Sequence, residues 1–547
     1  MILSSFKRRD ITSRLESTPY DLLVIGGGIT GAGIALDAVT RGLKTALIEK
    51  NDFAFGTSSR STKLIHGGLR YLKQLEFGLV KEVGSERAVV HQLAPHLVIP
   101  EKMLLPLTEK SLGATFTSIG LKIYDWLAGV KRADRRKMLT RQQTLKQEPL
   151  LKSDGIKAGA LYAEYRTDDA RLTIEIIKTA ASHGTDVLNY CEAVQFNYYE
   201  GSLVSINARD TYDQSIITIK SKCFVNATGP WVDELRMLDH SMKGKFLHLT
   251  KGIHLVVART KLPIQQAIYF EVEDGRMIFA IPRGRTTYIG TTDTNYNGNK
   301  NSVVAAKDDV NYLLKAVNNN FDSVDLRLVD VESSWAGLRP LISEEGKSAS
   351  ELSRKDEIFI SKTGLISIAG GKLTGYRKMA ERVINIVADR YFEDRPLKSC
   401  YTDKIPLIGN TFNSFEDVEK YCIQIEAKLL TLNMEAGYGK YLVHNYGSQT
   451  DAIMREFEKR NEESIDDRLI LAELDFVIKY EMITSPLDFF IRRTGLLFFN
   501  MSRVKDKMNL VIKEFQRQFG WSSARVKLET ENLELVIYQC TQFEDHE

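Results

Sequence analysis

The sequence predicts a protein of mixed α/β and α+β class, with a doubly wound Rossmann domain, an antiparallel-sheet domain and a C-terminal helical domain. Three observations support this prediction. A strand-like run at 21–25 leads into closely spaced glycines and a helix-like segment, which is typical of the first unit of a dinucleotide-binding domain. Short strand-like segments follow one another between residues 251 and 292. Helical segments fill the chain from about residue 396.

The first unit of the expected Rossmann domain spans residues 21–49. Residues 21–25, Asp-Leu-Leu-Val-Ile, predict a buried parallel strand. Residues 32–41 predict a helix, and residues 45–48 predict a second strand that ends in Glu49. Because strand, glycines, helix, strand and acidic residue occur in the required order, a nucleotide cofactor is the favoured interpretation.

Each of three glycines in this unit has an expected task. Gly26 is expected to make the tight turn after the strand, and Gly28 to let a pyrophosphate approach the backbone. Gly31 is expected to let the helix and the strand pack closely. The phosphates would then lie at the helix N-terminus, and Glu49 would accept hydrogen bonds from the ribose hydroxyls.

The remaining elements are expected in three groups. The doubly wound domain resumes with a helix at 171–182, a strand at 186–188, a small meander at 192–224, strands at 223–227 and 364–369, and a helix from residue 376. Antiparallel strands on the substrate side are expected at 253–258, 267–270, 277–281 and 287–290. Helices of the C-terminal cap are expected at 413–434, 448–459, 465–480, 486–494 and 501–519.

These elements predict a discontinuous three-domain organisation. The length of 547 residues exceeds what one hydrophobic core usually supports, so two or three domains are expected. The cofactor domain is assigned to 1–90, 155–245 and 345–395, the substrate domain to 91–154 and 246–344, and the helical cap to 396–547.

The composition excludes several classes of protein. With 43% hydrophobic and 27% charged residues, the chain has the composition of a soluble globular enzyme. The net charge is only +3, whereas a general nucleic-acid binder is usually more basic. No apolar run reaches the roughly 18 residues that would predict a transmembrane helix, and residues 1–19 lack the apolar core of a signal peptide. The 5 cysteines have no metal-ligand spacing, which predicts buried free thiols, no metal site and a reducing cytoplasm.

A hydroxyl-rich segment at 56–63 favours a flavin over a nicotinamide cofactor. Such a segment, just beyond the ribose-binding acid, can line a long and permanently held cofactor with hydrogen-bonding groups. It ends close to His66, Arg70 and Tyr71, which flank a pair of glycines at 67–68 that permit close backbone approach. The expected cofactor contacts in this segment are Thr57, Ser58, Ser59, Thr62 and Lys63.

Residues 26–71 closely resemble the FAD-dependent glycerol-3-phosphate dehydrogenases, and the resemblance covers nearly the whole chain in the expected order. The further motifs that carry it are 225–231 (Val-Asn-Ala-Thr-Gly-Pro-Trp), 289–293 (Ile-Gly-Thr-Thr-Asp), 335–341 (Trp-Ala-Gly-Leu-Arg-Pro-Leu), 370–378 (Gly-Gly-Lys-Leu-Thr-Gly-Tyr-Arg-Lys), 446–447 (Tyr-Gly) and 492–494 (Arg-Arg-Thr). Many relatives have threonine where this chain has Gly375, which makes a role for that residue doubtful.

The resemblance implies a glutathione-reductase-like FAD-binding domain and the oxidation of sn-glycerol 3-phosphate to dihydroxyacetone phosphate. The electrons would pass from the FAD to a membrane quinone. A homodimer is compatible with the resemblance. The further cofactor contacts that it implies are Thr228, Gly229, Gly371, Leu373 and Thr374.

Such an enzyme needs a base for the substrate hydroxyl and cations for the phosphate. His66 is the candidate base, although a purely structural histidine is the alternative. Arg339, expected in a turn after a strand, is the best candidate for the phosphate. Lys372 could neutralise charge on reduced flavin or hold phosphate, whereas His254 is expected to serve packing or hydrogen bonding within its strand. Catalytic roles are therefore assigned to His66, Arg70 and Lys372, and substrate contacts to Arg70, Tyr71, Arg276, Arg339, Arg354 and Lys372.

A helix expected at 117–137 could contact a membrane. Apolar residues from Ile119 to Val130 follow helical spacing, and a basic cluster follows at 131–137. An ordinary amphipathic helix with a solvated basic end is the alternative, but the resemblance favours peripheral binding to the cytoplasmic face of the plasma membrane.

Two other functions compete with the dehydrogenase. An oxidase on the same scaffold would reduce oxygen to hydrogen peroxide. The chain lacks an obvious added segment between Glu344 and Asp403 of the kind that oxidase relatives often carry, which favours the dehydrogenase. A non-catalytic flavin-binding interaction protein is the third interpretation, but it would not need convergent cations.

Overall fold

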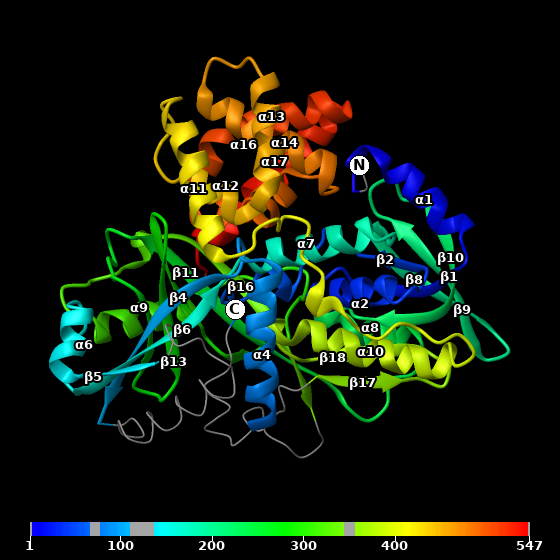
Figure 1. Cartoon of the computed structure of the whole chain (residues 1–547), viewed down its shortest axis with the longest axis horizontal. Helices are drawn as coiled ribbons and strands as arrows, with labels where there is room; N and C mark the ends of the chain where they lie inside the picture. Colours follow the sequence, from blue (N-terminus) through cyan, green and yellow to red (C-terminus); the bar gives the residue numbers. More distant parts are fainter. Residues whose placement is uncertain (1–2, 66–76, 110–135, 344–355, 545–547) are drawn as a thin grey trace.

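The computed structural model describes residues 3–65, 77–109, 136–343 and 356–544. In this part of the chain, two large β-sheets lie side by side and a group of helices from the C-terminal third lies above them (Figure 1). The mixed α/β and α+β class with a C-terminal helical domain is therefore confirmed. None of the described helices is long and apolar enough to cross a membrane.

The first sheet has 8 strands in the described residues, and its central strands are parallel. The expected strands at 21–25 and 45–48 are confirmed as β1 and β2, and their near-complete burial explains their apolar sequences. The strand order of this sheet is β17 (Glu357–Ile360), β18 (Ile366–Ala369), β10 (Ile216–Asn226), β1 (Tyr20–Ile25), β2 (Thr45–Ile48) and β7 (Asp186–Leu188). In addition, β9 (Ser202–Asp210) pairs with β10, and β8 (Cys191–Tyr199) pairs with β9.

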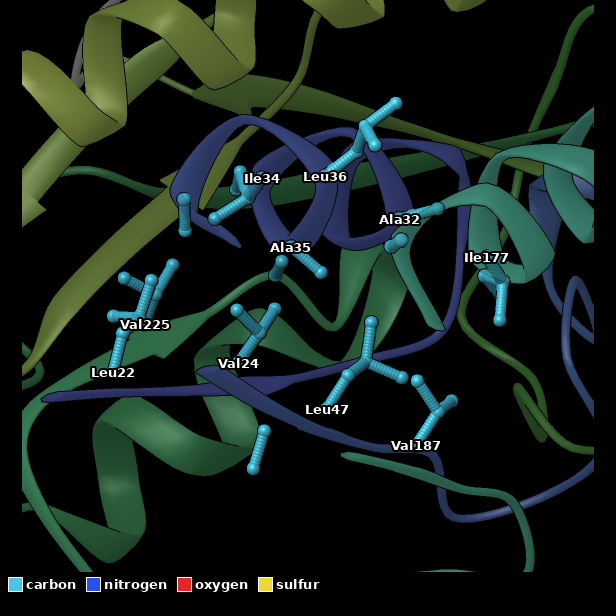
Figure 2. Close-up of a cluster of buried hydrophobic side chains, with 14 of the residues drawn as sticks. Leu22, Val24, Ala32, Ile34, Ala35, Leu36, Leu47, Ile177, Val187 and Val225 are labelled. Carbon is cyan, nitrogen blue, oxygen red and sulfur yellow. The ribbon is translucent and has the colours of Figure 1, made fainter. Parts of the chain in front are cut away.

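Three helices pack together beside strands β1 and β2 of this sheet. Helix α2 (Ile29–Thr40) lies between α10 (Tyr376–Tyr391) and α7 (Asp169–Ser182). Figure 2 shows Ala32 and Ala35 of α2 directed toward Val24 of β1 and Leu47 of β2. Small side chains on this face let the helix approach the strands closely, which positions the helix N-terminus at the carboxyl end of β1.

The second sheet has 10 strands in the described residues and is mostly antiparallel. The four expected antiparallel strands are confirmed as β11 to β14, although β11 begins earlier than predicted because it also pairs along β16. The order is β15 (Thr294–Asn295), β11 (Phe246–Ala258), β14 (Thr286–Gly290), β13 (Met277–Arg283), β12 (Ala267–Glu271), β4 (Ile99–Thr108), β6 (Ile156–Arg166) and β3 (Leu64–Ile65), with β16 (Val331–Ser343) beside β11 and β5 (Lys137–Thr140) beside β6.

Long-range strand pairing alters three local predictions. Arg339 was expected in a turn, but it lies within β16, opposite Thr250 of β11. Pro340 is tolerated there because β16 is an outer strand of the ladder with β11. Strand β6 was assigned to the cofactor domain, yet it pairs with β4 and β5 of the second sheet. The helix expected to end at Lys137 cannot extend that far, because β5 begins at this residue.

The C-terminal helices form a body whose hydrophobic core continues into side chains of the second sheet. Several helix bounds differ from those expected. Helices α12 and α17 were not predicted, and the segment expected as a helix at 486–494 contains a π-helical turn at Asp488–Arg493. The helices of this body are α11 (Phe415–Leu430), α12 (Tyr438–Tyr446), α13 (Thr450–Lys459), α14 (Ile465–Tyr480), α15 (Leu496–Phe499), α16 (Met501–Phe519) and α17 (Ser523–Thr541). The other α-helices are α1 (Arg8–Ser17), α4 (Phe77–Leu93), α6 (Arg141–Gln147), α8 (Val232–Leu238) and α9 (Lys307–Asn320). The exact domain boundaries stay predictions.

Candidate functional site

A cavity of about 670 Å³ lies where the carboxyl ends of the parallel strands face the second sheet. In open α/β sheets, ligands characteristically bind at this edge. The volume suits a small-molecule or cofactor site. Among the predicted site residues, those that line it are Gly26, Gly28, Glu49, Thr57, Ser58, Thr62, Thr228, Gly229, Arg339, Gly371, Lys372, Leu373 and Thr374.

The glycine turn has the geometry of a phosphate-binding loop. Gly26 has a φ of +118°, and a Cβ at this residue would lie 2.5 Å from the carbonyl oxygen of Ala227. A Cβ at Gly31 would overlap the carbonyl oxygen of Gly26, so α2 can approach β1 only because residue 31 is glycine. At Gly28, the only close neighbour of a Cβ among the described residues would be the hydroxyl of Ser58, at 3.3 Å. The backbone at Gly28 therefore borders the cavity directly.

Glu49 and Ser58 hold this turn in place. Glu49 accepts hydrogen bonds from the backbone amides of Gly27 at 2.7 Å and Asn51 at 2.9 Å. Burial raises the pKa of Glu49, although these two amides act in the opposite direction. Ser58 Oγ accepts a hydrogen bond from the amide of Ile29 at 3.0 Å, at the N-terminus of α2. Both acceptors therefore lie next to the amide-rich end of the helix, where a phosphate would bind.

The hydroxyl-rich segment connects the two sheets. It runs alongside β16, because Thr57 Oγ1 donates to the carbonyl of Leu338 at 2.7 Å and Trp335 Nε1 donates to the carbonyl of Ser61 at 3.1 Å. A Cβ at Gly337 would lie 2.5 Å from the carbonyl oxygen of Arg60. The glycine in β16 thus permits the close approach of the segment that also lines the cavity.

Arg339 reaches the cavity from β16. Its guanidinium donates to Thr291 Oγ1 at 2.9 Å and to the carbonyl of Thr292 at 3.0 Å, and it pairs with Asp293 at 3.1 Å. A Cβ at Gly252 would overlap the guanidinium, so the glycine in β11 creates the space that Arg339 occupies. The side chain is 26% exposed and lines the cavity.

His254 is a buried neutral histidine at the wall of the cavity. Its Nε2 lies 3.0 Å from Thr62 Oγ1, and its ring stacks on Trp335 with the centroids 4.8 Å apart. Burial, with smaller effects of Arg339 and Lys63, lowers its pKa well below the ordinary value. The hydrogen-bonding and packing role expected of His254 agrees with this position, although the residue also lines the cavity.

Besides Gly31, which packs α2 against β1, three predicted site residues of the described ranges do not line the cavity. Lys63 is 2% exposed and its ammonium pairs with Asp169 at 2.5 Å. Ser59 is buried and its hydroxyl lies near the backbone carbonyls of the preceding turn. Arg276 pairs with Asp274 at 2.5 Å on the exposed β12–β13 connection. Neither Lys63 nor Arg276 lines the cavity, and each forms an ion pair elsewhere in the protein.

Several predictions fall outside the described residues. They concern His66, Arg70, Tyr71 and Arg354, together with nearly all of the proposed membrane segment at 117–137. Their roles stay predictions.

Other residues of the cavity wall were not predicted. Arg60 lies in the hydroxyl-rich segment at 56–63 but was not assigned a role, and Gly337 lies inside the family motif at 335–341. Sequence signals for both residues were therefore present. Trp231 ends the family motif at 225–231, so it also had a sequence signal, whereas Gly252 is recognised only from the contacts that a Cβ there would make across the strands. The part of the cavity wall at 191–194 had no sequence signal for a binding site beyond its position after a predicted strand.

A buried ionic network joins the cofactor side of the cavity to the C-terminal helices. Asp52, which is fully buried, accepts from Arg493 at 2.8 and 2.9 Å and from Arg492 at 2.5 Å. Asn189 donates to the same carboxylate at 3.1 Å. Burial alone would raise the pKa of Asp52, but Arg493 and Arg492 hold it below the ordinary value. The loop that contains Asp52 packs against the glycine turn, since the amide of Ala54 donates to the carbonyl of Gly27 at 3.0 Å.

The thiols and candidate ligands of the described residues add no second site. All 5 cysteines are free, but Cys400 and Cys540 are only partly buried, which differs from the uniformly buried thiols expected. No cluster of three or more His, Cys, Asp or Glu side chains in the described ranges has a geometry that could hold a metal ion.

The residues present fit a dinucleotide cofactor. The absence of a Cβ at Gly28 leaves backbone open to the cavity beside the N-terminus of α2, as a pyrophosphate requires. Glu49 lies at the end of β2, where its carboxylate can also accept from ribose hydroxyls. The cavity continues from this turn to Gly252, Gly337 and Gly371, so it can accommodate a long ligand.

Comparisons with known proteins agree with this geometry. Residues 21–377 match the family of FAD dependent oxidoreductases, and residues 400–526 match the C-terminal domain of alpha-glycerophosphate oxidase. The chain is 46% identical to the aerobic glycerol-3-phosphate dehydrogenase of Bacillus subtilis (strain 168) over 543 residues, which is 98% of each chain. It is also 46% identical to the enzyme of the same name from Staphylococcus aureus (strain MRSA252), over 99% of this chain and 98% of the relative.

Solved structures show the same relationship. The glycerol-3-phosphate dehydrogenase of Bacillus halodurans, solved in complex with FAD, is 42% identical, with a TM-score of 0.85 and complete coverage of both chains. The α-glycerophosphate oxidase of Mycoplasma pneumoniae, 18% identical with a TM-score of 0.55 over 70% of this chain and 96% of its own, shares the fold. The chain therefore belongs to the FAD-dependent oxidoreductases, within the family of the aerobic glycerol-3-phosphate dehydrogenases.

Proposed function

We propose that this protein is an FAD-dependent dehydrogenase that oxidises sn-glycerol 3-phosphate to dihydroxyacetone phosphate. The observation that carries the proposal is the combination of two features in one cavity. A dinucleotide-binding turn at Gly26 and Gly28 forms one part of the wall, and Arg339 and Lys372 contribute cations to another. A phosphorylated substrate needs such cations beside the cofactor, whereas a protein that only stores flavin does not.

Different residues of the chain are expected to bind the substrate phosphate and to accept the hydroxyl proton. Bound FAD supplies the acceptor for the hydride that leaves the substrate carbon. Arg339 offers a planar fork to the substrate phosphate, and its contacts with Thr291 and Asp293 fix the direction of that fork. Holding the phosphate in this way orients the carbinol, from which a large part of the rate acceleration can come. His66, predicted as the base, would accept the hydroxyl proton.

The proposal includes a membrane quinone as the electron acceptor. Peripheral contact with the cytoplasmic face of the membrane through 117–137 would bring the protein to that acceptor. A glycerol-3-phosphate oxidase that reduces oxygen to hydrogen peroxide is the second candidate, and the observation that supports it is the match of residues 400–526 to the C-terminal domain of alpha-glycerophosphate oxidase. Both candidates share the first half-reaction and differ only in what reoxidises the flavin.

Stopped-flow absorbance of the purified holoprotein tests the proposal. Glycerol 3-phosphate should bleach the flavin spectrum rapidly, whereas glycerol, which lacks the phosphate, should do so poorly. Reoxidation is then compared between a soluble quinone analogue and air. A flavin that stays oxidised in excess glycerol 3-phosphate would leave only the non-catalytic flavin-binding protein. Rapid reoxidation by air with stoichiometric peroxide would identify the oxidase.

The location and assembly of the protein need separate measurements. Vesicle sedimentation should show salt-sensitive binding to anionic lipid, because electrostatic screening shortens to about 3 Å at 1 M salt. Charge reversal at Arg135 and Arg136 should weaken that binding without reducing activity on a soluble dye. Binding that is insensitive to salt and to these changes would place the membrane contact elsewhere. Light scattering would test the homodimer.

A further inference from the structure

Arg60 is a cation in the cavity wall for which the described residues provide no carboxylate partner. Its guanidinium carbon lies 5.1 Å from the centre of the Phe55 ring, which holds the side chain by a cation–π contact. The neighbouring Arg492 is paired with both Asp52 and Asp488. Arg60 therefore differs from the arginine next to it, whose charge is neutralised within the protein.

The surroundings of Arg60 disfavour its charge. Burial lowers the pKa of Arg60 to about 10, and the positive charge of Arg492 acts in the same direction. Arg60 is half-buried, and a cation that is partly removed from water is stabilised by an anion beside it. The described part of the protein supplies no such anion, whereas the cavity that Arg60 lines can hold an anionic ligand.

Arg60 packs against the same face of β16 from which the side chain of Arg339 projects. Gly337 and Arg339 are two residues apart in this strand, so their Cβ directions agree. A Cβ at Gly337 would lie 2.5 Å from the Arg60 carbonyl oxygen and 3.0 Å from the Arg60 Cβ. On the partner strand, Gly252 is paired with Gly337, and a Cβ there would overlap the guanidinium of Arg339. This glycine pair thus makes room for two arginines from different elements on one wall.

We propose that Arg60 is a second substrate-binding arginine, which holds the phosphate of sn-glycerol 3-phosphate together with Arg339. The inference rests on the proposed function and names a further residue of the same site. Two guanidinium groups can present several N–H donors to one phosphate. The pyrophosphate of the cofactor is a less suitable partner, because its expected position is the turn at Gly28, where the N-terminus of α2 borders the cavity.

The test compares Arg60→Gln and Arg60→Lys with the wild-type holoenzyme, and uses Arg285→Gln as the matched control. Arg285 is an exposed arginine paired with Glu332, and it does not line the cavity. Each protein is first checked for flavin content by absorbance. Two dissociation constants are then measured: that of glycerol 3-phosphate from the concentration dependence of flavin reduction, and that of inorganic phosphate from its perturbation of the oxidised flavin spectrum.

Arg60→Gln should weaken both ligands by about 10- to 100-fold, the loss expected for a charge-assisted hydrogen bond. The limiting rate of flavin reduction should change far less, because the phosphate contact persists through the reaction. Arg60→Lys should keep part of the affinity, since it retains the charge without the fork. Arg285→Gln should match the wild type in both measurements.

Two results would overturn the inference. One is unchanged affinity for both ligands in an Arg60→Gln protein that retains its flavin. The other is loss of FAD from this variant with normal substrate affinity after reconstitution, which would assign Arg60 to the cofactor phosphates. Failure of glycerol 3-phosphate to reduce the wild-type flavin would instead refute the proposed function, and the inorganic phosphate titration would still decide whether Arg60 binds an anion.

Discussion

The ionic network at Asp52 makes a quantitative prediction about how the C-terminal helices stabilise the cofactor side of the protein. Arg493 binds this carboxylate through both terminal nitrogens, and Arg492 and Asn189 complete its hydrogen bonds. The two residues Asp52 and Arg493 are 441 positions apart in the chain, and both are fully buried. The substitution Asp52→Asn preserves the size of the side chain, removes its charge and replaces one of its two acceptor oxygens by an amide donor.

The expected loss of stability depends on which acidic neighbours Arg492 and Arg493 retain when Asp52 is replaced. Removing one partner of a buried ion pair typically costs about 3–5 kcal/mol, because the other charge stays buried. Here each arginine retains a second acidic neighbour: Asp488 lies 2.7 Å from Arg492, and Glu481 lies 3.4 Å from Arg493. We therefore expect Asp52→Asn to lower the free energy of unfolding by about 3 kcal/mol, at the lower end of that range.

Urea denaturation followed by circular dichroism measures this loss. A shift of the midpoint at an unchanged slope reports stability alone. The matched control is Glu332→Gln, which removes a carboxylate from the partly exposed pair with Arg285. This control should change the free energy of unfolding by less than about 1 kcal/mol. Equal effects of the two substitutions would refute the reasoning, because they would show that the buried network contributes no more than a surface pair.

The pH dependence supplies a second check on the same substitution. The folded-state pKa of Asp52 is lowered, so its stabilising effect is complete above the unfolded value of about 3.9. The effect is lost as the pH falls through the folded pKa. The difference between wild type and Asp52→Asn should therefore be constant from pH 5 to pH 7 and should shrink below pH 4. A difference that grows toward low pH would contradict the lowered pKa.

Three further predictions concern the turn, the cation and a buried carboxyl. Gly31→Ala should displace α2 from β1, because its Cβ would overlap the carbonyl of Gly26, and should cost about 1–3 kcal/mol together with bound flavin, read from absorbance. Arg339→Gln should weaken glycerol 3-phosphate by about 1.5–3 kcal/mol in stopped-flow reduction and leave the slow reaction with glycerol nearly unchanged. Burial raises the pKa of Glu473 to about 7, so its ionisation destabilises the folded state progressively as pH rises from about 5 to about 8. Urea titrations should show Glu473→Gln gaining stability relative to wild type over that range.

Each of these predictions has a control within the chain. Gly375→Ala is the control for Gly31, since a Cβ there meets no described atom within 4 Å and its φ of −87° suits any residue. Equal flavin loss from both variants would show that the close approach of α2 is not the cause. For Arg339, equal losses with glycerol and glycerol 3-phosphate would indicate a structural role. Parallel pH profiles of wild type and Glu473→Gln would show that Glu473 titrates normally.

Much of the cofactor side could be predicted from the sequence, for a local reason. The turn at Gly26, the helix that follows it and Glu49 at the end of β2 are close in the chain, and their backbone requirements can be met only by particular residues in a particular order. The same applies to the antiparallel strands, whose apolar runs and turns are short-range signals. The family motifs added the cations of the substrate side, because motif residues such as Arg339 and Lys372 do line the cavity.

The partners of the charged side chains were decided only by the tertiary structure. Lys63 lies beside the predicted cofactor contacts in sequence, but folding brings Asp169, 106 residues further along the chain, to its ammonium. Arg60 lies in the same segment as Lys63, yet the described residues bring no acid to it.

The sequence by itself therefore determined the class of fold, the cofactor turn and the family, all of which depend on backbone geometry within short segments. Only the tertiary structure decided which cations form buried ion pairs away from the cavity and which line it. The physical reason is that an ion pair depends on where two distant segments meet. Asp52 and Arg493 have no sequence signal in common, and their contact exists only because the C-terminal helices pack against the loop beside the glycine turn.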